Sequence, residues 1–403
     1  MVCIVLMTAV DVGDDGFDVL VVGGNGRVGA STLRWLDRLL RRRSVVSGAP
    51  RLAVGGRSFE TFQKTQDRLS LSNLAFLPVD LEGGSQALIR AVERAKLVVH
   101  TAGPFQGRSA PDLLRACIAA GVPYCDVCDE FALSRNGKAL SAEARAAGVP
   151  AVLSCGIWPG VSALMAALAV EQLGGSEVCD RVELSFHTAG SGGAGPTIVS
   201  ATFLLLASQV ITIADHLIVP KEPWSDCRIV DFGGRIGRRP CFLLDNPDVP
   251  TISEAFGIAN CTSRFGTSPA LWNRLFGLIR ALPRTWLNNR SAMQKFAVLS
   301  MPVIRWVDGM VGATNAMRVD AYRNQADGRS PELVTLRCMH AQLDDCVGQA
   351  TAAFGLELLR GRGRSACGEA TIEPGVWYPA ELPAAIRSNI LSVVKENALV
   401  WQM

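Results

Sequence analysis

The chain has 403 residues, of which 49% are apolar and 19% are charged, and its formal net charge is +3. This composition excludes a disordered or fibrous protein, and the length predicts about two domains. The basic residues are scattered apart from Arg41, Arg42 and Arg43, so we expect no nucleic-acid partner. Twelve cysteines without a repeating spacing indicate reduced thiols, and four histidines far apart in the sequence argue against a zinc site, so no metal is expected.

The N-terminal segment carries a short apolar run from Val2 to Val10, with no basic residue before it and acidic residues after it. This pattern is typical neither of a secretory signal nor of a transit peptide. We therefore expect residues 1–16 to form an N-terminal tail that leaves the compartment open.

A nucleotide-binding pattern follows the tail. Residues 18–22 predict a buried parallel strand, and residues 30–40 predict a helix with a leucine face. The loop between them reads Gly23-Gly24-Asn25-Gly26-Arg27-Val28-Gly29. Gly24, Gly26 and Gly29 have the G-x-G-x-x-G spacing of a dinucleotide fingerprint. We expect Gly24 to permit the tight turn, Gly26 to let the backbone approach a pyrophosphate, and Gly29 to let the helix pack on the strand, while the helix N-terminus offers N–H groups to the anion.

The end of the second predicted strand indicates which dinucleotide binds. The strand segment at residues 51–58 ends in Arg57 and Ser58, where an NAD-binding unit would carry an acidic residue for the ribose 2′-hydroxyl. A guanidinium at this place would pair with a 2′-phosphate, which favours NADP (NADPH) over NAD. The alternative is that Arg57 is a solvated loop residue and Ser58 an ordinary helix cap.

Two further strand ends complete the predicted cofactor site. Asp80 ends the strand at residues 74–80 and either borders the adenine or caps the next helix. The strand at 97–100 leads into the loop Thr101-Ala102-Gly103-Pro104, which would lie beside the topological switch point where open α/β sheets bind ligands. Six β-α units are predicted up to residue 155.

With these motifs, the chain resembles the saccharopine dehydrogenase-like oxidoreductases. The resemblance rests on residues 21–29, 55–58, 98–105, 121–127 and 155–162. In the second half the chain resembles a plastid-associated plant and algal branch of that family, in residues 186–197, 264–267, 317–320 and 374–379. The branch implies a plastid, or chloroplast, location, with the cytoplasm as the alternative.

The resemblance also implies a fold: an α/β chain with a Rossmann-type, doubly wound parallel sheet and a second, mixed α+β domain. We expect the NADP-binding domain at residues 17–158, a substrate and dimerisation domain at 159–375, and a C-terminal segment at 376–403 that packs back on the first domain. Lysine-pathway members carry an acidic-polar stretch after the Pro-Gly that matches Pro159-Gly160, whereas this chain continues with Val161-Ser162-Ala163. Saccharopine itself is therefore not the expected substrate.

The second half combines alternating strands with two apolar segments. Residues 181–187, 317–322 and 332–338 alternate with a period of two, which predicts a sheet with one buried and one wetter face. Residues 197–214 carry no charge and predict a buried helix under the substrate site, with a membrane span or interfacial contact as alternatives. Residues 272–286 mix Trp, Leu and Arg and predict an amphipathic helix that either covers the core or lies on a membrane surface.

Reduction of a C=C or C=N bond by hydride leaves an anion that must gain a proton, so a proton donor is expected near the nicotinamide. Tyr124 and Asp126 are candidates because they end a strand next to the cofactor loop; the alternative is that Tyr124 only packs and Asp126 only caps or orients backbone. His187 is a third candidate, because it precedes the glycine-rich loop at residues 190–195. That loop would close over substrate or bind an oxyanion, or it is a plain turn between elements.

Together these patterns predict an NADPH-dependent reductase that acts on a hydrophobic small molecule. One alternative is a saccharopine-type imine reductase or dehydrogenase acting on an amino-acid adduct. Another is a catalytically silent NADP-binding sensor or scaffold. Peripheral membrane contact and a homodimer are left open as partners.

Overall fold

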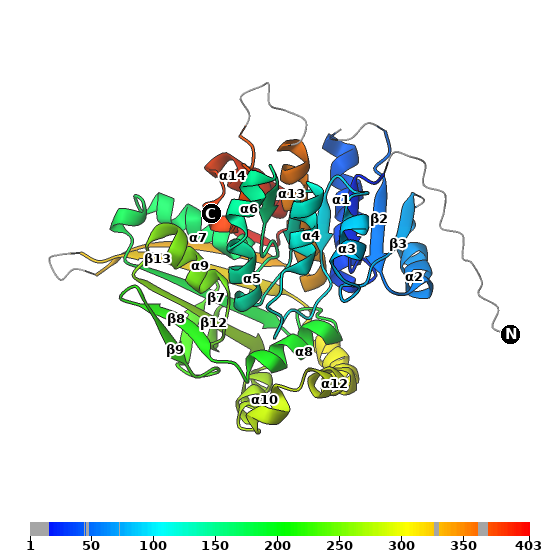
Figure 1. Ribbon diagram of the computed structural model, residues 1–403. Helices are drawn as coiled ribbons and strands as arrows, with labels where there is room; N and C mark the ends of the chain where they lie inside the picture. Colours follow the sequence, from blue (N-terminus) through cyan, green and yellow to red (C-terminus); the bar gives the residue numbers. More distant parts are fainter. Residues whose placement is uncertain (1–15, 44, 46–47, 72, 326–329, 362–369) are drawn as a thin grey trace.

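The computed structural model of the protein describes residues 16–43, 45, 48–71, 73–325, 330–361 and 370–403 (Figure 1). The predicted tail, up to residue 15, and its apolar run lie outside the described residues.

The first domain is built on a seven-stranded parallel sheet in the order β15-β6-β5-β4-β1-β2-β3. Its strands are β1 (Val19–Val22), β2 (Leu52–Gly56), β3 (Leu74–Pro78), β4 (Val98–His100), β5 (Tyr124–Asp126), β6 (Pro150–Val152) and β15 (Gly375–Trp377). The central strands are buried on both faces, as the short apolar runs of the sequence require. The predicted Rossmann-type sheet is confirmed, and β15 adds a seventh strand beside β6 from near the end of the chain.

Helices cover both faces of this sheet. They are α1 (Arg27–Arg43), α2 (Phe59–Leu69), α3 (Ser85–Val92), α4 (Asp112–Ala120), α5 (Phe131–Lys138) and α6 (Ser141–Ala146). A later helix, α13 (Leu343–Gly361), lies so close along α1 that a Cβ on Gly348 would be 2.5 Å from Ser31 Oγ. Helix α13 therefore packs with the first sheet, although the expected boundary at residue 375 assigns it to the second domain.

The second domain is a nine-stranded mixed sheet. Its strands are β7 (Arg181–Ala189), β8 (Val210–Ala214), β9 (Leu217–Lys221), β10 (Arg228–Asp231), β11 (Arg238–Leu243), β12 (Asn260–Ser268), β13 (Asn315–Arg323), β14 (Glu332–His340) and β16 (Val400–Gln402). Strands β7 and β12 pair in parallel, whereas the remaining pairs are antiparallel. The last strand, β16, pairs with β14, so the C-terminal segment contributes β15 to one sheet and β16 to the other.

The two domains share one hydrophobic core. The other helices are α7 (Val161–Gln172), α8 (Pro196–Leu205), α9 (Asp248–Phe256), α10 (Ala270–Arg280), α11 (Arg284–Leu287), α12 (Arg290–Val311) and α14 (Ala384–Lys395). Helix α7 is apolar nearly all round, and its side chains join one buried cluster with α1, α13 and the inward face of β7, including Leu184 and Phe186. Because this core is continuous, the second sheet is held firmly against the first domain.

The sequence predicted a single buried helix over the uncharged residues 197–214, and this prediction is wrong. Helix α8 ends at Leu205, and β8 begins at Val210. The run Val210-Ile211-Thr212-Ile213 is β-branched throughout, which favours a strand. None of the helices in the described residues has the length and apolar character needed to cross a membrane.

Candidate functional site

The glycine loop between β1 and α1 forms a concave backbone surface, here called the cradle, in which side chains at Gly23 and Gly29 would collide with neighbouring backbone atoms. Gly23 adopts a φ of +85°, and a Cβ there would lie 2.6 Å from the backbone nitrogen of Ala102. A Cβ on Gly29 would lie 2.4 Å from the carbonyl oxygen of Gly23. The tight turn expected at Gly24 is thus made at Gly23, whereas Gly24 packs closely under Leu33. A Cβ on Gly26 would meet only the Gly23 oxygen, at 3.3 Å, so the backbone at Gly26 is open to a ligand.

The ribose side of the cradle contains the two residues expected to select NADP. Arg57 is exposed at the end of β2 and makes no ion pair or hydrogen bond within the described residues. Ser58 caps α2, because its Oγ accepts a hydrogen bond from Thr61 N at 3.2 Å. Asn25 Nδ2 donates to Ser58 O at 3.4 Å and ties the glycine loop to this strand end. The geometry leaves the Arg57 guanidinium free for a 2′-phosphate.

Asp80 is exposed just beyond the end of β3, where its Oδ1 accepts a hydrogen bond from Glu82 N at 3.1 Å. It does not cap the following helix, since α3 begins after Gly84 without a side-chain cap. Its place beside the β2 end is compatible with the expected position at the adenine.

The loop after β4 is tied to both domains. Thr101 donates to Val22 O through its backbone N–H at 2.8 Å and through Oγ1 at 3.1 Å. Ala102 lies against Gly23, and the peptide between Gly103 and Pro104 is cis. Pro104 O accepts a hydrogen bond from Arg290 Nη2, in the first turn of α12, at 2.7 Å. The cofactor loop is therefore hydrogen-bonded both to β1 and to α12 of the second domain.

Tyr124 and Asp126 form a buried hydrogen-bond network together with His100. The Tyr124 hydroxyl donates to Asp126 Oδ2 at 3.0 Å and lies 3.0 Å from His100 Nδ1. Asp126 Oδ1 accepts from the backbone N–H groups of Ser154 at 2.7 Å and Cys128 at 3.1 Å. Because the hydroxyl proton points to the carboxylate, His100 Nδ1 must carry its own proton and donate it to the Tyr124 oxygen. His100 Nε2 is then an acceptor, and it has no partner within the described residues.

Burial sets the protonation of this network. Desolvation raises the pKa of Asp126 to about 6, although its backbone hydrogen bonds oppose the shift. Desolvation also lowers the pKa of His100 to about 3, with a smaller contribution from Arg108, and raises the pKa of Tyr124 well above its usual value. The histidine is thus neutral and the tyrosine protonated at neutral pH. The three side chains line a cavity of about 40 Å³, which has room for one or two water molecules.

Sequence reasoning missed His100, although a signal was present. His100 and Asp126 are paired in register at the ends of the neighbouring parallel strands β4 and β5. A polar residue at the end of each of two consecutive buried strands predicts such a contact when the strands are neighbours.

His187 does not join this group. Along β7, Phe186 faces the shared core and contacts Trp158 with ring centroids 5.2 Å apart. Because side chains alternate, His187 points to the opposite face of the sheet, where its ring meets Phe232 and its Nε2 lies 3.1 Å from Ser268 Oγ. Burial lowers the pKa of His187 to about 4. His187 thus lies apart from Tyr124 and Asp126, and its catalytic role stays a prediction.

The glycine-rich loop at residues 190–195 reaches the cofactor cradle. Ser191 N donates to Asp308 Oδ1, on α12, at 2.7 Å, and Asn315 Nδ2 donates to Gly192 O at 3.1 Å. A Cβ on Gly195 would lie 2.9 Å from Cδ of Arg27 in the fingerprint loop. Helix α12 thus contacts two loops at the cofactor edge, through Arg290 at its start and Asp308 near its end, and neither residue was anticipated from sequence.

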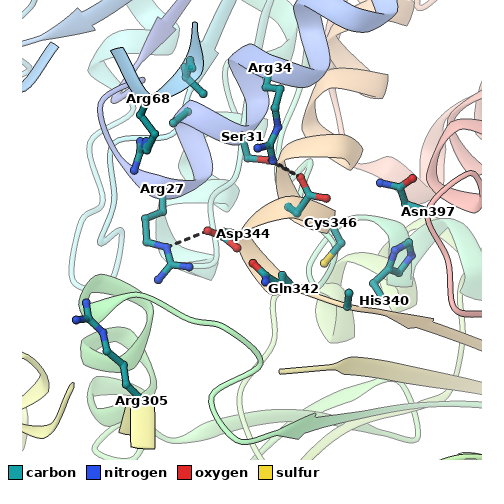
Figure 2. Close-up of a pocket in the computed structure, with 14 residues that line it drawn as sticks. Arg27, Ser31, Arg34, Arg68, Arg305, His340, Gln342, Asp344, Cys346 and Asn397 are labelled. Atoms are coloured by element: carbon teal, nitrogen blue, oxygen red, sulfur yellow. Dashed lines mark hydrogen bonds and ion pairs between the residues drawn. The ribbon is translucent and has the colours of Figure 1, made fainter. Parts of the chain in front are cut away.

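A large charged cavity, of about 790 Å³, flanks the fingerprint on the outer side of α1 (Figure 2). Four arginines line it, from both domains: Arg27, Arg34, Arg68 and Arg305. Arg27 Nε is 2.9 Å from Asp344 Oδ2, and Arg34 Nη2 is 2.5 Å from Asp345 Oδ1. Arg68 and Arg305 have no such partner within the described residues. This lining suits an anionic group and does not supply the apolar pocket expected for a hydrophobic substrate.

Comparison with known proteins agrees with this geometry. Residues 19–152 match the family model described as the saccharopine dehydrogenase NADP binding domain. Two Mycobacterium tuberculosis proteins, from different strains and both carrying the name trans-acting enoyl reductase, are 30% identical over 142 residues. The match covers 35% of this chain and 32% of each relative, so it spans about a third of the relatives' length. The resemblance to a plastid-associated branch stays a prediction.

Among solved structures, saccharopine dehydrogenase (L-Glu forming) from Saccharomyces cerevisiae aligns over 96% of this chain and 99% of its own, with a TM-score of 0.61 and 12% identity. At that identity the likeness concerns the fold alone. The predicted α/β fold with a second mixed-sheet domain is confirmed, and so is the predicted cofactor. The first domain of this chain thus matches the model of the saccharopine dehydrogenase NADP binding domain over residues 19–152.

Proposed function

We propose that the protein is an NADPH-dependent reductase that delivers hydride to a C=C or C=N bond of a hydrophobic small molecule. The NADP-binding domain supports the cofactor, and the name of the mycobacterial relatives supports reduction of a C=C bond conjugated to a carbonyl group.

The observation that carries the proposal is the character of α8, the element of the second domain that begins against the fingerprint loop. Helix α8 has no charged residue, and Gly195 before it packs on Arg27. Its polar side chains are hydroxyls alone. An amino-acid adduct would need buried charged partners for its carboxylates and amino group, because unpaired buried charges are costly. The absence of charge on α8, which begins beside the fingerprint loop, therefore favours an apolar substrate.

In the proposed reaction, separate groups of residues bind the cofactor and supply the proton. The open backbone at Gly26 and the N-terminus of α1 bind the pyrophosphate, and Arg57 pairs with the 2′-phosphate. Bound NADPH supplies the hydride. Tyr124 provides the proton that the resulting anion needs. Burial keeps its hydroxyl protonated, and the O–H must turn from Asp126 to the anion to transfer the proton, after which the hydrogen bond from His100 Nδ1 stabilises the phenolate oxygen.

The arginine-lined cavity favours a second candidate. Arg68 and Arg305 lie on its walls without ion-pair partners in the described part of the chain, and they would match the carboxylates of an amino-acid adduct. Reduction of an imine in such an adduct is therefore the alternative reaction.

The experiment is substrate-dependent oxidation of NADPH by the purified protein, followed by the loss of NADPH absorbance. A long-chain α,β-unsaturated acyl thioester represents the first candidate, and the imine formed between lysine and 2-oxoglutarate represents the second. We expect turnover of the thioester only, and Arg68→Ala should leave it unchanged.

Turnover of the imine that Arg68→Ala abolishes would instead establish the second candidate. Tight NADPH binding with no turnover of either compound, or of any co-purified molecule identified by mass spectrometry, would contradict both and favour a silent NADP-binding protein.

A further inference from the structure

The helices α10, α11 and α12 expose an unusual number of large apolar side chains. Within the described residues, ten of the fifteen exposed large apolar side chains lie between residues 271 and 311. They are Leu271, Leu278, Leu282, Trp286, Val298, Leu299, Val303, Trp306, Met310 and Val311. We call these residues, with the basic side chains among them, the helical surface. Scattered exposed leucines are normal, but a concentrated set indicates a binding surface.

The apolar residues form regular stripes rather than a random scatter. On α12, Leu299, Val303, Trp306 and Met310 follow one another at intervals of four, three and four residues, and they are 77%, 57%, 67% and 59% exposed. This spacing places all four on one side of the helix. The opposite side of α12 is buried, so the helix has two apolar faces, and only one of them is covered by the described residues.

The helices present their exposed faces together. Phe276 of α10 and Phe296 of α12 both pack on Phe203 of α8, with ring centroids 6.4 Å and 5.1 Å apart. Trp286 of α11 lies edge-on to Phe296 at 5.7 Å. Because these inner faces share one platform, the outer faces of α10 and α12 point away from the protein body, and both helices lie at the lower edge of the molecule in Figure 1.

The helical surface is also strongly basic. Residues 270–311 contain six arginine or lysine residues and one acidic residue, a net charge of +5 in a chain whose total is +3. Arg284 is paired with Glu222 at 2.8 Å. Arg274 and Lys295 are exposed and have no ion-pair partner within the described residues.

We propose that the helical surface binds the anionic surface of a lipid bilayer, with α10 and α12 lying in the plane of the interface. Trp and Leu side chains would enter the headgroup region, and the unpaired Arg274 and Lys295 would contact lipid phosphates. A second copy of the chain fits less well, because a twofold contact would bring the unpaired Arg274 and Lys295 of both copies together. The contact is peripheral, since none of the helices in the described part of the chain is suited to crossing a bilayer.

The position of the helical surface has a consequence for substrate entry. Arg290, in the first turn of α12, donates a hydrogen bond to Pro104 in the cofactor loop at 2.7 Å. The membrane-binding helices therefore lie next to the cofactor edge, and an apolar substrate dissolved in the bilayer would have a short path to it. This consequence rests on the proposed function, whereas membrane binding does not.

The test is flotation of the full chain with vesicles of phosphatidylcholine alone or with phosphatidylglycerol added. The first variant combines Leu299→Asp with Trp306→Asp, and the second combines Arg274→Glu with Lys295→Glu. Leu217→Asp is the matched control, because Leu217 is 67% exposed on β9, outside the helical surface. NADPH binding by each variant checks that it is folded, since none of these residues lies in the cofactor site.

We expect the wild type and Leu217→Asp to float with anionic vesicles and to bind neutral vesicles at least about tenfold more weakly. Both double variants should lose at least about tenfold in affinity while retaining NADPH binding, and added salt should weaken wild-type binding because it screens the lipid charge. Absence of the wild type from the floating fraction with both vesicles would overturn the proposal. If the wild type binds no vesicles but sediments as a dimer, and the Leu299→Asp, Trp306→Asp variant sediments as a monomer, the helical surface is instead a contact between two copies of the chain. If the wild type binds vesicles but shows no substrate-dependent oxidation of NADPH, the proposed function alone is contradicted.

Discussion

Replacement of Arg57 by alanine tests the assignment of the 2′-phosphate site. Arg57 is exposed at the end of β2 and contributes no ion pair or hydrogen bond to the described structure, so its removal should leave the fold intact. The substitution deletes only what the guanidinium would give to a bound ligand. NADPH and NADH differ in the 2′-phosphate alone, so the difference between their affinities isolates that interaction.

The expected magnitude follows from the exposure of the site. A charge-assisted hydrogen bond contributes about 1.5–3 kcal/mol, and an arginine fork can make two to one phosphate. Solvent and salt screen an exposed pair, so we expect a loss near 2 kcal/mol, which is about 30-fold in the Kd for NADPH. The Kd for NADH should change by less than about twofold, because no phosphate is present to lose the contact.

The assay is titration of each variant with NADPH and with NADH, followed by nucleotide fluorescence. Lys64→Ala is the matched control: it also removes a positive charge near this edge, but Lys64 lies on α2, 73% exposed, and is paired with Glu60 at 2.6 Å. An equal loss of affinity for both nucleotides in Arg57→Ala, or no loss for NADPH, would refute the reasoning. The 2′-phosphate would then have to be bound by another group.

Three further outcomes follow from the geometry of the site. Gly29→Ala should lower the free energy of unfolding by about 2–3 kcal/mol in urea denaturation and weaken NADPH binding, because its Cβ would overlap the turn, whereas Gly309→Ala, with open space around it, should be harmless. Tyr124→Phe should reduce turnover at least about tenfold with the Kd for NADPH unchanged. It should also lower the free energy of unfolding by about 1–3 kcal/mol, because it leaves a buried oxygen of Asp126 without its hydrogen bond. Full turnover by this variant would exclude Tyr124 as the proton donor. The pKa of Asp126 is about 6 in the folded chain and about 4 in the unfolded chain. Between about pH 4 and about pH 6 the carboxyl group is therefore protonated in the folded state and ionised in the unfolded state. The contribution of Asp126 to the free energy of unfolding should therefore fall by roughly 3 kcal/mol as the pH rises from about 4 to 6, and it should stay constant above about pH 6. In urea denaturation across this pH range, Asp126→Asn should abolish this decrease. If the free energies of unfolding of the wild type and the variant changed in parallel with pH, the raised pKa would be contradicted.

Local patterns in the sequence were sufficient for the cofactor domain. The glycine spacing at residues 24–29 and the strand before it are properties of a continuous segment, and the structure forms the cradle there. The alternating strands of the second half were predicted for the same reason, since a period of two is visible in a single run of residues. The tight turn expected at Gly24 lies at Gly23 instead, because the position of a tight turn depends on what packs against it, here Ala102 against Gly23 and Leu33 against Gly24.

Contacts between distant segments were decided only by the tertiary structure. His100 joins Tyr124 and Asp126 because β4 and β5 are neighbours in register, and His187 faces away because the register of β7 turns Phe186 toward the core. Arg290 meets Pro104 across 186 residues of sequence, and β15 returns to β6 from near the chain end. The apolar stripe of α12 could be recognised in the sequence as one face of a helix, but only the tertiary structure shows that α8 packs on the other side and that no described segment covers the stripe. Sequence periodicity shows that a face is apolar, whereas the global arrangement of the chain determines whether another segment covers it.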